Sequence, residues 1–340
     1  MEYVSGHILT ETGFQKGFLC IKDENVVDQG SGLPPKTPIE KGFIVPTFID
    51  MHTHVGDGFI RKKDILLPHD IMQLVAPPHG LKHRLLAEAK EEDILSGMNQ
   101  TIQEMIVNGT SLFVDFRENG IKGISVLRDA LSSFSLSSLV LARPERLQFD
   151  KNEINDLLKN ADGIGLSSIS DWPINDIEDI ASLTHKNDKI FAIHASERIR
   201  EDIDTILGLK PSFLVHMNNA TKSDLEMTKA ADIPIVLCPR SNSFFNIMIQ
   251  LPLLKKIGND VLLGTDNAML HEPSLTREII HLLHTFPDVF SLEELLYMVT
   301  YGSRKALNLK DSIPQLTFPA SFLVLHKETL EPIYRFQRDM

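Results

Sequence analysis

The chain has 340 residues, of which 42% are hydrophobic and 24% charged, so it can bury a large core. Its formal net charge of -12 argues against a nucleic-acid partner, because phosphate binding relies on clustered Lys and Arg. Cys20 and Cys238 are too few for a disulfide framework. No apolar run approaches the ~20 residues that span a bilayer, and no signal peptide is evident. We expect a cytoplasmic protein with a small-molecule substrate and no membrane partner; the sequence is compatible with a homo-oligomer.

The two ends of the chain differ in pattern from its middle. Residues 1–45 alternate and turn without helical spacing, which predicts β-structure. Residues 320–325 and 330–334 read as two further strands. We therefore expect a small β-sandwich domain formed by residues 1–45 together with 318–340, and a second domain over residues 46–317.

The middle of the chain alternates short apolar runs with amphipathic stretches of helical spacing. This alternation is typical of βα units around a parallel sheet. Eight such runs can be counted, and eight strands with intervening helices predict an α/β fold, a (β/α)8 barrel of the TIM type. The runs are residues 43–50, 110–116, 137–142, 163–168, 189–194, 212–216, 234–238 and 261–266.

Helix signals fall where this topology needs them. Residues 91–107 are periodic and end at Asn108-Gly109. Ser291 with Glu294 predicts a capping box that opens a helix running towards Leu307. Residues 56–90 are much longer than a typical connection of ~4–6 residues, so we expect this segment to cover the barrel mouth.

His52 and His54 are the most informative pair of residues. They are two apart at the end of an apolar run, so on a strand they project from one face. Taken alone, such a pair is equally explained as two histidines satisfied by carbonyl groups. Three further apolar runs, however, end at or carry His194, His216 and Asp266, which can each bind or orient a cation. The strand ends of a barrel converge at its mouth, so these residues predict a metal site there.

Other polar residues also follow the predicted strands. Arg117, Arg143 and Arg240 can bind an anionic group of a substrate through their planar guanidinium groups, or pair with nearby carboxylates. Trp172 can stack on a heteroaromatic ring or simply pack in the core. Asn242 completes this set of candidate substrate-binding residues.

Five motifs together resemble the amidohydrolase superfamily, in particular its branch of cytosine-deaminase-like, triazine-hydrolase and S-adenosylhomocysteine-deaminase proteins. The resemblance covers nearly the whole chain and implies the same barrel with a small terminal β-sandwich. One departure is Thr47, where Gly is common in the family. The motifs are Phe48-Ile-Asp-Met-His-Thr-His54, His194-Ala-Ser-Glu197, His216, Cys238-Pro-Arg-Ser-Asn242 and Gly264-Thr-Asp266.

The resemblance implies a mononuclear metal site. His52, His54, His194 and Asp266 would bind one divalent metal, zinc or iron(II), and His216 would lie beside it. Some relatives hold two metals bridged by a modified lysine on the fourth strand, and residues 161–171 contain no lysine. A metal at an open site lowers the pKa of bound water from ~15.7 to ~7.

The resemblance also implies roles for three catalytic residues. Asp266 would accept a proton, Glu197 would carry protons to the substrate nitrogen, and His216 would orient the attacked centre. We expect a hydrolase of C–N bonds other than peptide bonds that deaminates a purine-, pterin- or pyrimidine-type heterocycle with release of ammonia. Hydrolysis of a cyclic or acyclic amide is the alternative, and a non-catalytic scaffold is the second alternative.

Overall fold

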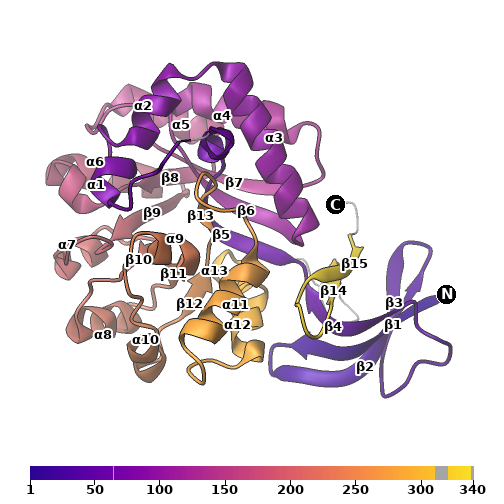
Figure 1. The fold of residues 1–340 in the computed structure, drawn as a ribbon. Coiled ribbons are helices and arrows are strands. Elements are labelled where there is room, and N and C mark those ends of the chain that lie inside the picture. The colour runs from indigo at the N-terminus through magenta and orange to yellow at the C-terminus, as the bar shows by residue number, and fades with distance from the viewer. Residues whose placement is uncertain (64, 311–320, 338–340) are drawn as a thin grey trace.

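The computed structural model describes residues 1–63, 65–310 and 321–337. Its strands form two sheets, one of which is surrounded by helices while the other lies to one side of it (Figure 1). The expected domain boundary at 317/318 and the first residue of the expected strand 320–325 lie outside the described residues.

Eight parallel strands follow one another in chain order through the larger sheet, as the alternation predicted. Each is hydrogen-bonded to the next, and most of their residues are buried because helices cover the outside of the sheet. The strands are β5 (Phe48–His54), β6 (Thr110–Arg117), β7 (Ser137–Ala142), β8 (Gly163–Leu166), β9 (Ile190–Ala195), β10 (Phe213–His216), β11 (Ile235–Leu237) and β12 (Val261–Leu263).

The short strand β13 (Asp266–Asn267) lies beside β5, the first strand of the larger sheet. It follows β12 after two residues and pairs in parallel with β5, with Asp266 opposite Thr53 and Asn267 opposite His54. The pairing therefore runs from β12 through to β5, and the chain after β12 comes back to pair with β5 through β13, which gives a TIM-like arrangement. Apolar side chains such as Met51, Phe116 and Val215 fill its interior.

The expected first strand over residues 43–50 is wrong in its bounds. The structure divides this apolar run between β4 (Glu40–Pro46) in the smaller sheet and β5 in the larger one. The chain changes sheets at Thr47, whose N–H donates to the carbonyl of Ser321 rather than to a barrel strand. The residues on both sides of Thr47, from Ile44 to His54, are buried, so a continuous apolar run hides the change.

Helices flank the parallel strands on the outside. The bounds of α3 agree with the expected helix at 91–107. The helices are α3 (Glu91–Val107), α4 (Gly120–Leu131), α5 (Lys151–Asn160), η2 (Ile169–Asp171), α6 (Ile174–Lys186), α7 (Ile203–Gly208), α8 (Lys222–Ala230), α9 (Pro239–Phe244), α10 (Leu251–Ile257), α11 (Leu275–Thr285), α12 (Leu292–Met298) and α13 (Tyr301–Ala306).

The expected continuous helix from Ser291 to Leu307 is also wrong, because it is interrupted. The capping box of Ser291 and Glu294 is present at the start of α12, as predicted. The helix breaks at Thr300, whose backbone is non-helical, and the carbonyl of Val299 accepts the N–H of Ile49 on β5. This bond to the barrel replaces a bond within the helix.

Both termini contribute to the smaller sheet. It is mixed, has six strands in the order β15-β14-β4-β1-β2-β3, and joins the two ends of the chain through antiparallel pairing of β14 with β4. Its remaining strands are β1 (Glu2–Thr10), β2 (Gly13–Lys22), β3 (Asn25–Ser31), β14 (Phe322–Leu325) and β15 (Pro332–Phe336).

The segment after β5 lies over the carboxyl ends of the strands. It forms η1 (Val55–Lys62), α1 (Ile71–Leu74) and α2 (Leu81–Glu88). Its apolar side chains, including Phe59 and Leu86, pack against Phe245 and Met269 from the loops that follow β11 and β13. The segment therefore covers the mouth of the barrel. Within the described part of the chain, no helix is long and apolar enough to cross a membrane.

Candidate metal centre

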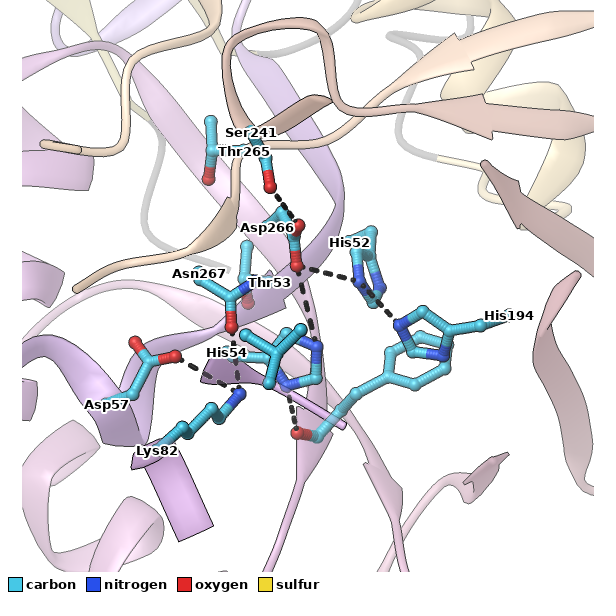
Figure 2. Close-up of polar contacts among 12 residues, drawn as sticks. His52, Thr53, His54, Asp57, Lys82, His194, Ser241, Thr265, Asp266 and Asn267 are labelled. Carbon is cyan, nitrogen blue, oxygen red and sulfur yellow. Dashed lines mark hydrogen bonds and ion pairs between the residues drawn. The ribbon is translucent and has the colours of Figure 1, made fainter. Parts of the chain in front are cut away.

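His52 and His54 lie at the carboxyl end of β5 and are both buried. Their imidazole rings converge on one carboxylate: Nε2 of His52 is 3.4 Å from Oδ1 of Asp266, and Nε2 of His54 is 3.6 Å from the same oxygen. In Figure 2 dashed lines join both rings to Asp266. The two-residue spacing on a strand has this effect because it places both side chains on one face.

Asp266 is held in an uncommon backbone conformation. Its φ is +60°, in the left-handed region that non-glycine residues seldom adopt, and such residues concentrate at functional sites. The hydroxyl of Ser241 donates a hydrogen bond to its second oxygen, Oδ2 (Figure 2). The preceding Gly264 allows a close approach, because a Cβ there would lie 2.7 Å from the Cβ of His52. The chain is thus shaped to bring the carboxylate against β5.

His194 extends the cluster from β9. Its Nε2 lies 3.2 Å from Nε2 of His52, and its Nδ1 lies 2.8 Å from the carbonyl oxygen of Leu166. The ring is buried. Two overlapping groups, one of His52, His54 and Asp266 and the other of His52, His194 and His216, each bring their ligand atoms within 4.8 Å of one another. This histidine cluster suggests a metal site.

The protonation of the rings tests whether a cation fits. A carbonyl oxygen can only accept, so Nδ1 carries the proton in His194, and also in His54, where Nδ1 is 3.1 Å from the carbonyl of Phe116. Burial lowers the pKa of His54 to about 3 and the pKa of His194 well below its usual value, so both rings are neutral. The Nε2 atoms of these two rings consequently present lone pairs to the centre of the cluster.

Asp266 presents negative charge to the same centre. Burial alone would raise its pKa, but the hydrogen bond and charge of His52 hold that pKa well below its usual range. The lone pair of His54 Nε2 therefore faces an ionised oxygen at 3.6 Å with no proton between them. Two facing acceptors repel each other unless a cation lies between them, and imidazole and carboxylate ligands suit zinc and similar divalent ions. The residues fit a divalent metal.

Glu197 and His216 lie beside this cluster. Nε2 of His216, at the end of β10, is 3.4 Å from Oε1 of Glu197, which follows β9. Burial raises the pKa of Glu197. His216 also has a positive φ, +77°, and its Nδ1 lies 3.5 Å from the side-chain nitrogen of Asn242. The pair thus combines a carboxylic acid whose pKa is raised with an imidazole whose far nitrogen, Nδ1, is held by Asn242.

A cavity of about 70 Å³ opens beside these groups. Its wall combines the site residues with apolar side chains of the covering segment, such as Ile71 and Val75. Arg143 also lines it, is 6% exposed, and has an Nε without a hydrogen-bond partner. Typical ligand pockets measure ~300–1,000 Å³, so this cavity is smaller than a usual ligand pocket.

Four expected substrate-binding residues lie outside the cavity wall. Arg117 is buried in ion pairs with Asp115 and Glu118. Trp172 packs in the core, where its indole N–H donates to Ser167. The remaining two lie behind the site: Asn242 is fully buried against His216, and the guanidinium of Arg240 pairs with Glu278 on α11. These residues support the site and leave Arg143 as the expected arginine that faces the cavity.

Sequence reasoning did not identify Lys82 and Asp57, two charged residues near the histidine cluster. Lys82 on α2 is only 2% exposed, and its ammonium lies 3.1 Å from Asp57 and 2.9 Å from the side-chain oxygen of Asn267 (Figure 2). Lys82 follows a leucine and precedes His83-Arg84, a pattern typical of a solvated helix. The sequence feature that could have drawn attention to Lys82 is its place in residues 56–90, a segment too long to be a simple connection.

A larger cleft of about 650 Å³ lies elsewhere, at the amino-terminal ends of β10, β11 and β12. It is bounded by the β1–β2 hairpin and by α12 and α13, and its described lining includes Thr12, Asn259 and Glu293. The four clustered histidines are not among those lining residues. The chemistry therefore favours the smaller cavity as the candidate functional site.

Comparison with known proteins relates this geometry to a family. Residues 43–318 match the model of the amidohydrolase family. The chain is 34% identical to an uncharacterised protein of Methanocaldococcus jannaschii, over 90% of this chain and 81% of that protein. It is 23% identical to a 5-methylthioadenosine/S-adenosylhomocysteine deaminase of Pyrococcus furiosus, over 79% and 71%. Its fold is similar to the zinc-bound crystal structure of an adenosine deaminase from Xanthomonas campestris, with a TM-score of 0.72, 16% identity, and coverage of 95% and 84%.

Proposed function

The chain belongs to the amidohydrolase family, and on that basis we propose that it deaminates an amino-substituted heterocycle of the purine, pterin or pyrimidine type and releases ammonia. The observation that carries this proposal is the placement of Glu197, an acid with a raised pKa, 3.4 Å from His216 and at the wall of the cavity. Release of ammonia requires a proton for the departing nitrogen, and a carboxylic acid with a raised pKa can supply one near neutral pH.

The proposed cofactor is one divalent metal, zinc or iron(II), held by His52, His54, His194 and Asp266. The facing lone pair and carboxylate of His54 and Asp266 support this ligand set. When bound, the metal would supply water activated for attack at neutral pH. His216 is not included as a ligand, because its Nδ1 faces the amide nitrogen of Asn242, a donor, so its Nε2 carries the proton.

The proposed roles of the side chains follow from these protonation states. Asp266, ionised and restrained by Ser241, accepts a proton from the attacking water. Glu197, whose pKa is raised by burial, transfers a proton to the ring nitrogen or the leaving amine. His216 donates from Nε2 towards the attacked centre and fixes the position of Glu197. Each role uses a group that lines the same cavity.

Arg143 is the proposed binding residue for an anionic group of the substrate. Its guanidinium is buried at the cavity wall, and its Nε has no hydrogen-bond partner in the described structure. A buried donor without a partner is costly, and a carboxylate or phosphate of a ligand would satisfy it. Entry of a ring-sized substrate requires the covering residues Ile71 and Val75 to move outward, because the cavity measures about 70 Å³.

The experiment that tests this function is an assay of ammonia release by the zinc- or iron-loaded protein. Amino-purines, pterins, pyrimidines and their nucleosides form the panel, and Glu197→Ala is the matched variant. We expect one substrate class to release ammonia, with turnover lowered ~10²–10⁴-fold in the variant while its metal content is retained. Equal turnover in Glu197→Ala would contradict the proposed proton transfer, and hydrolysis of amide substrates alone would contradict deamination.

A further inference from the structure

One buried oxygen is shared between the histidine cluster and the covering segment. Oε1 of Glu118, which follows β6, lies 2.9 Å from Nδ1 of His54 and 2.7 Å from Nζ of Lys82 on α2. All three residues are less than 5% exposed. The other carboxylate oxygen, Oε2, is 2.5 Å from the guanidinium of Arg117. The carboxylate therefore contacts the imidazole of His54, the ammonium of Lys82 and the guanidinium of Arg117.

The position of Glu118 gives it an effect on His54. It faces the Nδ1 edge of the ring, on the side opposite the lone pair that points to the cluster. The Nδ1–H bonds to the carbonyl of Phe116, which fixes the ring, and the nearby negative charge of Glu118 increases the basicity of the imidazole. Loss of such an outer carboxylate typically weakens metal binding by ~10–100-fold.

Lys82 contacts the same oxygen, and its positive charge opposes the effect of Glu118 on His54. Its ammonium lies closer to Oε1 than the imidazole does, and it adds a positive charge near a site that would hold a cation. Its place is fixed by Asp57 and Asn267, which lie at 3.1 Å and 2.9 Å. Asn267 directly follows Asp266 in β13. The lysine is thus anchored to both sides of the cluster.

We propose that Glu118 and Lys82 are an opposed pair of positioning residues that set the metal affinity of the site through their shared contact at Oε1. Glu118 strengthens the binding of a divalent cation through His54, and Lys82, carried by the covering helix α2, weakens it. Metal affinity then depends on how α2 lies over the mouth. This inference rests on the metal site of the proposed function.

The test measures Zn²⁺ affinity by competition with a chromophoric chelator, on metal-free full-length protein. Glu118→Gln is expected to bind Zn²⁺ ~10–100-fold more weakly than the wild type. Lys82→Met keeps the length of the side chain without its charge, and is expected to bind about 3- to 10-fold more tightly, as for a partly screened charge. Lys82→Gln serves if Lys82→Met does not fold, with the same expected direction.

Two controls separate this effect from a general loss of structure. Lys82→Arg restores the charge and is expected to return the affinity to the wild-type value. Lys90→Met removes an exposed lysine that precedes α3 and is expected to leave the affinity unchanged. A merely structural role for Lys82 predicts weaker binding in both Lys82→Met and Glu118→Gln.

The outcomes distinguish the two proposals. Opposite changes of Zn²⁺ affinity in Glu118→Gln and Lys82→Met support the opposed pair. Changes of the same sign, or a wild-type affinity in Glu118→Gln, overturn it while the metal site of the proposed function remains. A wild-type protein that binds no Zn²⁺ overturns both.

Discussion

The mouth of the barrel and the cleft at its opposite end are built from different kinds of residue. The cleft is larger, about 650 Å³ against about 70 Å³, but acidic side chains at its edge, such as Asp232 and Glu293, are exposed. At the mouth, His52 and Asp266 are almost completely buried. Burial of polar groups is costly unless they are satisfied, so a convergent buried cluster indicates function more strongly than volume does.

Removal of a metal-ligand candidate at the mouth should give the largest effect. His194→Ala deletes the imidazole that lies 3.2 Å from His52, so we expect metal affinity to fall by more than ~100-fold, beyond the effect of residues behind the ligands. Turnover should fall below detection at limiting metal. Chelator competition and ammonia release measure the two effects. Wild-type affinity in this variant would mean that β9 supplies no ligand.

Arg143→Met should produce a smaller and more selective effect. If Arg143 binds an anionic group, its loss removes a charged hydrogen bond of ~1.5–3 kcal/mol, so KM should rise by at least about 10-fold with kcat little changed. The comparison uses substrates with and without the anionic group, in Arg143→Met and Arg143→Lys. An equal change of KM for both substrates would exclude the anion-binding role.

Stability should also depend on pH at the mouth, because Glu278 is buried there against Arg240 at the start of α9. Burial raises its pKa to about 8, above the usual 4.5. The folded state therefore favours the protonated acid, and this contribution to stability is full below about pH 4.5 and is lost as pH rises towards 8.

The matched variant for this effect is Glu278→Gln, which still offers an oxygen to the N–H of Arg240. Between pH 5 and 8 the wild type should lose up to ~1.4 kcal/mol of stability per pH unit relative to the variant. Denaturant unfolding at the two pH values measures the difference. Parallel pH profiles would show that Glu278 is ionised in the folded protein throughout this range.

The opposite cleft should give the smallest effect. Glu293→Gln changes an exposed acid at the cleft, far along the chain from every proposed ligand, and should leave kcat and KM within about twofold of the wild type. Steady-state kinetics on the identified substrate provide the test. A large loss of turnover would indicate that the cleft, rather than the mouth of the barrel, is the functional site.

The sequence predicted the barrel because each βα unit carries its own local signal. The apolar run and the two-residue spacing of His52 and His54 are local features, and so is the periodicity of α3. Local patterns failed where the chain passes from one buried surface to another, as at Thr47 and Thr300. In both places a backbone group bonds to a residue distant in sequence. The N–H of Thr47 bonds to Ser321, and the carbonyl of Val299, beside Thr300, bonds to Ile49.

The supporting residues of the site could not be predicted for the same reason. Lys82 is buried only because Asp57, Glu118 and Asn267 come from three other parts of the chain. Arg117 and Arg240 follow strands just as Arg143 does, but acids from neighbouring elements pair with them. Residue type and position at a strand end indicate a candidate, and only the packing shows which candidates face the cavity.

The most direct measurement is the metal content of the purified, reconstituted protein, determined by mass spectrometry for the wild type and for Asp266→Ala. We expect one divalent metal per chain in the wild type and a large loss in the variant, because Asp266 is the carboxylate on which His52 and His54 converge. Equal metal content in the two proteins, or no metal in the wild type after reconstitution with zinc or iron(II), would contradict the account.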